Sequence, residues 1–292
     1  AMDSGSNSLR SLVATELAEP ADPRVTAMAA ALAAFYPGAA RAVLFYGSCL
    51  RERELDGLML DFYLIVADYR AAYGRTWLAA ANRLIPPNVF PFEHDGLAAK
   101  YAVLSEADFH RLNGAEADNV SVWARFAQPS RLVWAADQAA RDTVVQAVAR
   151  APETLLTLAP GVLHERDSLG RWRRGFALTY GAELRAERGD RPGSIVDFDP
   201  GRYTRFGQAV GPPANPTSLD QRWRKLRRRG KMLSVLRLAK ASFTFAGGID
   251  YLAWKINRHA GTDIVLKPWQ RRWPLLGAIT LLPLLLKRGA IR

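Results

Sequence analysis

Three residues in the first quarter of the chain combine types and spacing that suit phosphate chemistry. The stretch "FYGS" ends in Gly47 and Ser48, and Asp61 follows inside the apolar run "MLDFYLIV". A glycine lets the backbone approach a phosphate, and a serine hydroxyl can donate to a phosphate oxygen. A buried carboxylate is costly unless a partner or a metal ion compensates its charge. A site where a carboxylate and Mg²⁺ hold a polyphosphate would make use of all three residue types. A structural aspartate bonded to a neighbouring turn is the alternative.

The order of these features resembles the nucleotidyltransferases related to DNA polymerase β: a strand ending in Gly-Ser, a charged loop, and a strand that carries an aspartate. That superfamily usually has two acids spaced Asp-x-Asp, whereas Tyr63 occupies the second position here. Asp56 in the preceding loop and Glu93 further along are therefore candidates for additional metal ligands beside Asp61.

The elements that must position these residues are readable from the same region. Segment 22–38 predicts a helix, because Asp22 suits an N-cap, Pro23 the first turn and Gly38 the end. The runs "RAVLFYGS" and "MLDFYLIVA" are almost continuously apolar, so we expect strands that are covered on both faces.

A hairpin is expected next, in "NVFPFEHDGLAAKYAVLS". Asp95-Gly96 is a strong turn signal, Pro91 restricts the first strand to an edge or a bulge, and Ser105 can cap a following helix. The chain up to residue 136 thus predicts an α+β fold, a mixed sheet with helices.

Beyond that point the pattern becomes helical, and a Pro-rich stretch at 211–218 suggests a linker. We therefore expect a nucleotidyltransferase domain at 1–136, a helical domain at 137–215 and a basic C-terminal region at 216–292.

Composition narrows the partners. The 292 residues include 40 Lys and Arg against 28 Asp and Glu, a formal net charge of +12, which favours an anionic partner such as a nucleotide, nucleic acid or acidic lipid. Cys49 is the single cysteine, so an intrachain disulfide or a cysteine-rich metal site is excluded, and a reducing compartment fits. Residues 1–21 lack the apolar core of a signal peptide, which favours a cytoplasmic location.

The C-terminal region suggests contact with a membrane surface. Arg227 and Lys231 belong to a dense run of cations, and the apolar stretch 274–286 follows Trp269 and Trp273. As a helix this stretch would span about 20 Å, too short for a hydrocarbon core of about 30 Å. Tryptophans and cations suit the headgroup interface, so we expect a peripheral anchor; a buried core helix is the alternative.

A closer resemblance emerges from several stretches in register: "FYGS", "MLDFYLIVAD", Trp77 with Asn82, "HDGLAAKYAVLS" and "LTYGAELR". Over roughly residues 40–210 the chain resembles the mitochondrial-type phosphatidate cytidylyltransferases, the family of the translocator assembly and maintenance protein. The resemblance implies a DNA polymerase β-like domain, a helical, winged-helix-like domain and an amphipathic C-terminal tail. It also implies CTP and phosphatidic acid as substrates, with Mg²⁺ as cofactor.

The same resemblance assigns roles to residues. Tyr46, Gly47 and Ser48 would lie at the CTP phosphates, Asp61 would bind Mg²⁺, and Lys100 would face the same pocket. In that family, too, the strand carries a single aspartate.

Other positions are less closely matched. Arg185 would serve the lipid phosphate, although an ordinary ion pair on its helix is the alternative. Cys49 and Ala102 stand where the family tends to have glycine, and "RFAQPSRLVW" replaces a Gly-Arg-rich loop. Arg125 and Arg131 are therefore candidates for the nucleotide-contacting arginines, with a solvated surface role as the alternative.

The expected activity is transfer of CMP from CTP to phosphatidic acid, giving CDP-diacylglycerol and pyrophosphate at the inner face of the cell membrane, without a nucleic-acid partner. One alternative is a nucleotidyltransferase with another acceptor, either another lipid phosphate or an RNA end. The other is a non-catalytic nucleic-acid-binding protein. The sequence does not indicate an oligomeric state.

Overall fold

The computed structural model describes residues 3–51, 54–74, 76–158, 167–182, 191–211, 219–244 and 265–272. The chain divides into two compact units, one of residues 1–114 with 126–151 and one of residues 115–125 with 152–292. Neither unit is a continuous segment, because residues 115–125 belong to the second unit. The helix over Gln138–Leu158 runs through the boundary at 151. This grouping therefore differs from the three consecutive segments expected from composition.

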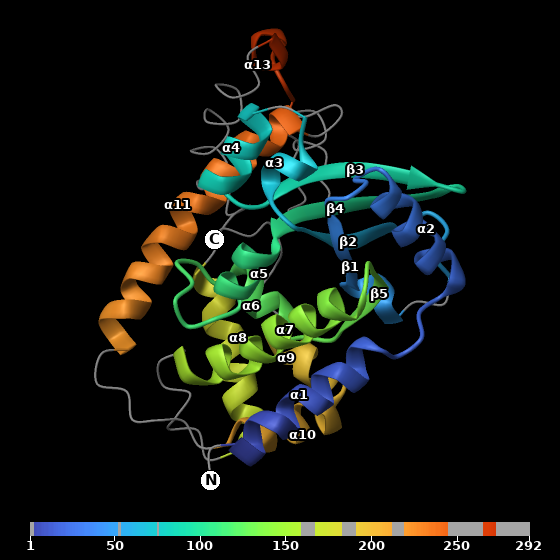
Figure 1. The fold of residues 1–292 in the computed structure, drawn as a ribbon. Coiled ribbons are helices and arrows are strands. Elements are labelled where there is room, and N and C mark those ends of the chain that lie inside the picture. Colours follow the sequence, from blue (N-terminus) through green and yellow to red (C-terminus); the bar gives the residue numbers. More distant parts are fainter. Residues whose placement is uncertain are drawn as a thin grey trace. The chain divides into compact units, whose positions relative to one another are not determined.

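The first unit is built on a five-stranded mixed sheet (Figure 1). The strand order is β3-β4-β2-β1-β5. Strands β2 and β4 are parallel and the other neighbours antiparallel, so the expected α+β class is confirmed. Strand β3 forms one edge and contains Pro91, as expected. The bounds are β1 Ala40–Tyr46, β2 Met59–Val66, β3 Asn88–His94, β4 Leu97–Ser105 and β5 Ser130–Ala135.

Helices of the first unit cover this sheet. The described helices are α1 Asp3–Leu17, α2 Pro23–Ala34, the 3-10 helix η1 Ser48–Arg51, α3 Tyr69–Ala72, α4 Thr76–Leu84, α5 Glu106–Leu112 and α7 Gln138–Leu158, whose last turns belong to the second unit. On one face, residues of α2, α3 and α4 join the core formed by Phe62 and Leu64 of β2 and Tyr101 of β4. On the other face, Phe126 contacts Tyr63 of β2 and Phe109 of α5. Both faces are therefore covered, as the apolar strands predicted.

Local signals explain several boundaries. Asp22 caps α2 by accepting a hydrogen bond from the Arg24 backbone N–H at 2.9 Å. Ser105 caps α5 in the same way, accepting from the Asp108 N–H at 3.1 Å. Asp95 and Gly96 take φ values of 48° and 78°, which is the left-handed geometry of a tight hairpin turn. These three features were expected from the sequence.

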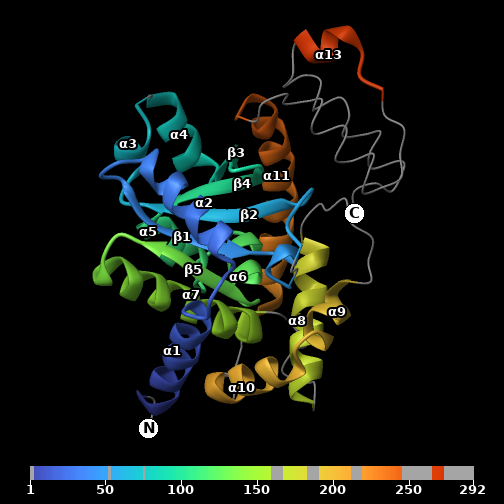
Figure 2. The same cartoon turned by 90° about the vertical axis from the view of Figure 1, so that its right-hand side faces the viewer.

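The second unit contains helices in the part that the structure describes. They are α6 Ser121–Phe126, which ends at the boundary, α8 Ser168–Ala182, α9 Arg191–Asp197, α10 Pro200–Val210, α11 Leu219–Thr244 and α13 Pro268–Arg272 (Figure 2). Trp172 of α8 donates its indole N–H to the carbonyl of Tyr203 in α10 at 2.8 Å. Trp223, Leu226 and Leu233 form the buried stripe of α11. Within the described residues, no helix combines the length and apolar character needed to cross a membrane.

Candidate functional site

Strand pairing brings the central predicted residues together. Asp61 of β2 lies opposite Tyr46 of β1 on one side and opposite Lys100 of β4 on the other. Side chains of directly paired residues project from the same face of a sheet, so the three form a row across neighbouring strands. Gly47 immediately follows Tyr46 at the end of β1. The sheet thus places Gly47, Asp61 and Lys100 at one site.

The carboxylate of Asp61 is only partly compensated. The Lys100 ammonium lies 3.3 Å from Asp61 Oδ1, with exposed side-chain fractions of 26% and 20% respectively. Oδ1 itself is buried and has no hydrogen-bond donor among the residues described. The Lys100 contact is therefore an ion pair that lacks the geometry of a hydrogen bond. A buried acceptor left without a donor costs about 1 to 3 kcal/mol, so this oxygen is suited to receive a further cationic or donor group.

Gly47 is required by both backbone geometry and space. Its φ is +93°, and a Cβ at this position would lie 3.0 Å from Asp61 Oδ2. An alanine would therefore be strained and would also push on the carboxylate. Ser48 is exposed and begins η1, in which the Leu50 N–H donates to the Gly47 carbonyl at 3.2 Å. Gly47 thus lies directly beside Asp61.

Tyr63, which stands two residues after Asp61, is packed among aromatic rings. Its ring packs 5.2 Å from that of Tyr46 and 5.1 Å from that of Phe126, and Tyr63 is only 6% exposed. The position therefore belongs to an aromatic cluster on the same face of the sheet as Asp61. A second carboxylate there would be buried among rings.

The other candidate metal ligands do not join Asp61. Asp56 has 74% of its side chain exposed and lies 3.7 Å from Arg24, and Glu93 is exposed on the edge strand β3. Glu93 pairs with Ala98 and is two strands away from β2, or about 10 Å in the hydrogen-bonding direction. Among the described residues no group of three or more His, Cys, Asp or Glu side chains could hold a metal.

A magnesium ion still fits the residues present, with Asp61 as its one protein ligand. Mg²⁺ is commonly bound through one or two carboxylates, with substrate phosphates and waters completing the octahedron. The buried Oδ1 atom without a donor is the feature that suits it. The neighbouring Lys100 ammonium would neutralise part of the negative charge of a bound polyphosphate.

The two candidate arginines are placed differently from Lys100. Arg131 pairs with Phe45 in the sheet, one residue out of step with the Tyr46–Asp61 row, so it projects from the opposite face. Its guanidinium donates to Glu19 at 2.7 Å. The structure therefore does not bring Arg131 to Asp61. Arg125 is half-buried in α6, within the other unit, and its nucleotide contact stays a prediction.

The residues predicted for lipid or membrane contact belong to the second unit. Arg227 and Lys231 are exposed on α11, and Trp269 of α13 is 43% exposed. Arg185, Trp273 and the apolar stretch 274–286 lie outside the described residues.

Two neighbours of the row were missed from the sequence. Cys49 is buried and its Sγ lies 3.5 Å from the Met59 carbonyl, which fastens η1 to the start of β2. Ser130 pairs with Tyr46 at the start of β5, and its Oγ is buried with no hydrogen-bond partner among the described residues. Placing Ser130 in this row requires the register of β5 against β1, which the sequence does not provide.

Comparisons with known proteins add little to this geometry. No protein-family model matches the chain, and no curated protein sequence matches it. A solved structure, a nucleotidyltransferase-like protein from Exiguobacterium sibiricum, aligns over 91% of this chain and 92% of its own, with 10% sequence identity and a TM-score of 0.29. A TM-score this low carries no argument about fold or activity. The feature that points to a function is the arrangement of Gly47, Asp61 and Lys100.

Proposed function

We propose that this protein is a Mg²⁺-dependent nucleotidyltransferase that transfers the cytidylyl group of CTP to phosphatidic acid, forming CDP-diacylglycerol and pyrophosphate. The observation that carries the general activity is the close grouping of a positive-φ glycine turn, a carboxylate whose buried Oδ1 accepts no hydrogen bond, and a lysine that forms an ion pair with it. The choice of CTP and phosphatidic acid rests on the sequence resemblance alone.

Each residue of the row has a separate task in this proposal. Gly47 keeps the turn free of a side chain, so a phosphate can approach the backbone next to Asp61. Asp61 would hold Mg²⁺, which when bound neutralises phosphate charge and aligns the triphosphate. The Lys100 ammonium, 3.3 Å from Asp61, supplies a fixed positive charge at the same place.

The reaction needs positioning more than proton transfer. An oxygen of the phosphatidate phosphate attacks the α-phosphorus of CTP, the bond from that phosphorus to the bridging oxygen breaks, and pyrophosphate leaves with the electron pair. Because the attacking phosphate is already largely ionised near neutral pH, no strong general base is required. Alignment of the two phosphates and cationic stabilisation by Lys100 would supply the catalysis that the chain itself provides.

A lipid acceptor requires contact with a membrane surface, and α11 suits this role. From Gln221 to Thr244 its sequence contains no acidic residue. Cations including Arg227 and Lys231 are exposed, and Met232 and Leu236 are 56% and 39% exposed further along the helix. Cations near an anionic bilayer contribute about 1 kcal/mol each, and exposed apolar side chains can enter the interface. We infer a peripheral position at the inner face of the cell membrane.

The deciding experiment is a product assay with Mg²⁺, phosphatidic acid in detergent, and each of the four nucleoside triphosphates in turn. We expect CDP-diacylglycerol and pyrophosphate with CTP, and neither without Mg²⁺. Turnover only when phosphatidic acid is replaced by another lipid phosphate or an RNA end would favour a different acceptor. Salt-sensitive retention on RNA, with no nucleotide turned over, would instead indicate a nucleic-acid-binding protein.

A further inference from the structure

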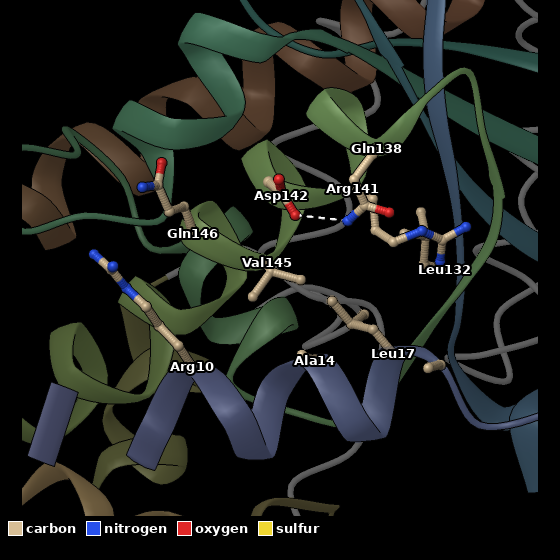
Figure 3. A pocket seen from close by; sticks show the side chains of 10 residues that line it. Arg10, Ala14, Leu17, Leu132, Gln138, Arg141, Asp142, Val145 and Gln146 are labelled. Carbon is tan, nitrogen blue, oxygen red and sulfur yellow. Dashed lines mark hydrogen bonds between the residues drawn. The ribbon is translucent and has the colours of Figure 1, made fainter. Parts of the chain in front are cut away.

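A pocket of about 300 Å³ lies away from the Asp61 row, in the first unit (Figure 3). It is bounded by α1, β5 and α7 and contains none of Gly47, Asp61 or Lys100. Its lining residues are Arg10, Ala14, Leu17, Ala18, Leu132, Gln138, Arg141, Asp142, Val145 and Gln146. Ligand pockets span about 300 to 1,000 Å³, so this one suits a small ligand rather than a lipid with two acyl chains.

Apolar side chains and Asp142 lie in the middle of the pocket, and the other polar side chains lie towards its ends. In Figure 3, Val145 of α7 and Leu17 of α1 lie between Arg10 with Gln146 at one end and Arg141 at the other. Leu17 is 2% exposed and forms part of the floor. An apolar floor with a few polar groups at its margin is the usual composition of a small-molecule site.

The polar groups at the two ends are not equivalent. Asp142 of α7 lies between the two ends and accepts a hydrogen bond from Gln138 at 2.8 Å, which turns its carboxylate towards the Arg141 end (Figure 3). No acidic side chain lines the pocket beside Arg10. Within the described part of the chain, neither Arg10 nor Arg141 forms an ion pair. The Arg10 end is therefore the better place for an anion.

We propose that this pocket binds a single-chain anionic amphiphile, with its phosphate or carboxylate at Arg10 and Gln146 and its alkyl chain over Leu17, Val145 and Leu132. Arginine pairs with phosphate and carboxylate through two parallel N–H donors, and the chain gains by leaving water. The inference is independent of the activity proposed for the Asp61 row, because it concerns other residues and needs no nucleotide.

Calorimetric titration of the full chain tests this inference, using decyl phosphate and decanoate below their micelle-forming concentrations. We expect one ligand per chain. Tighter binding of decyl phosphate would identify a phosphate monoester as the preferred class, and tighter binding of decanoate a fatty acid. Equal binding of decyltrimethylammonium would overturn the proposal, because Arg10 should repel a cation. Equal binding of inorganic phosphate would also overturn it, because the apolar floor would then contribute nothing.

Paired variants locate the site. Ala14→Phe should fill the pocket and Arg10→Gln should remove the headgroup contact, each weakening binding about tenfold or more. The matched controls are Ala139→Phe, at an exposed position of α7 outside the lining, and Arg70→Gln, at an exposed arginine of α3. Both should bind as the parent does. Undiminished binding by Ala14→Phe, with an unchanged melting temperature, would place the ligand elsewhere and refute the assignment.

Discussion

Asp61 is constrained on two sides, and each constraint restricts what can replace it. On one side the Lys100 ammonium lies 3.3 Å from Oδ1, and on the other a Cβ at Gly47 would lie 3.0 Å from Oδ2. A larger side chain at position 61 would collide with the turn, and a neutral one would leave Lys100 without its counter-charge. The smallest informative change is therefore the isosteric amide.

Asp61→Asn should abolish pyrophosphate release while the protein still folds. The amide has almost the same shape as the carboxylate but cannot supply the charge that a hard cation requires. Turnover and thermal melting should be measured together, with and without Mg²⁺. Asp95→Asn is the control, because Asp95 is an exposed turn residue with φ 48°, which asparagine also tolerates. Near-normal turnover of Asp61→Asn would remove this carboxylate from the reaction.

Gly47→Ala should impair CTP binding more than its cost in stability explains. Forcing an L-residue into the left-handed region costs about 1 to 2 kcal/mol, and the new Cβ would also press on Asp61. Gly38→Ala is a matched control, since Gly38 has φ +74° but a Cβ there would meet nothing within 4 Å. Gly38→Ala should lose stability through the backbone alone and Gly47→Ala somewhat more, and only Gly47→Ala should lose affinity for CTP. Equal CTP affinity in the two variants would reduce the Gly-Ser turn to a strand ending.

Sequence reasoning located this row better than it located the arginines. Gly47 and Asp61 were accessible because a glycine turn and a carboxylate in an apolar run are unusual, and both needed an explanation. Arg131 could not be placed, because its position depends on the alternation along β5, and the register of that strand is set by pairing with β1. A change of one residue in the register of β5 would turn Arg131 from the face on which it contacts Glu19 to the face that carries Asp61.

At the scale of elements, caps and turns could be predicted from neighbouring residues, whereas strand pairing between distant segments could not. The helix after Asp22 and the hairpin at Asp95-Gly96 were predicted because their caps and turns are local. Strand β5 was missed because the short run beginning at Ser130 follows Pro129 and resembles a loop. The parallel pairing of β2 with β4 arises from contacts between distant segments, which periodicity does not report.

The folding stability of the protein should depend on pH through Lys240 of α11. Burial, with a further contribution from the charge of Arg237, lowers the pKa of Lys240 from 10.5 to about 7. Between these values the unfolded chain binds a proton at Lys240 that the folded protein does not, so this residue makes stability rise with pH across that range. The loss of folding stability caused by burying Lys240 is at its full size below about pH 7, and it disappears above about pH 10.5.

Lys240→Met should therefore raise the melting temperature at pH 7, and its advantage over the parent protein should shrink as the pH approaches 10. Lys231→Met, at an exposed lysine of the same helix, should show no such pH-dependent difference. Melting curves of the three proteins at several pH values provide the measurement. A constant difference between Lys240→Met and the parent would mean that Lys240 keeps its proton in the folded state.

At the scale of the whole molecule, the net charge is +12, and positively charged residues are concentrated in α11. Its exposed surface carries arginines and lysines over several turns, and the sequence from Gln221 to Thr244 contains no acid. Part of this charge is used within the second unit, where Arg229 lies 2.7 Å from Asp118 and Arg237 donates to Asn119 at 3.2 Å. Arg224, Arg228 and Lys231 are among the exposed cations of this helix and are spaced to lie along one side of it.

Replacing these three cations together with glutamine should weaken binding to vesicles of phosphatidylcholine and phosphatidylglycerol. At about 1 kcal/mol per cation, the loss is about 100-fold, and it should approach zero in high salt as screening removes the electrostatic contribution. The charge-matched control replaces Arg70, Arg83 and Arg205, which are also exposed but lie on other helices. Flotation of the three proteins with vesicles, alongside turnover of a short-chain soluble phosphatidate, separates membrane attachment from catalysis. We expect the α11 variant to keep its activity on the soluble acceptor and to lose it on vesicles.

Equal flotation of the two triple variants would show that α11 does not attract the membrane. Retention on RNA that falls only in the α11 variant, without flotation of the parent, would assign this helix to a nucleic acid instead.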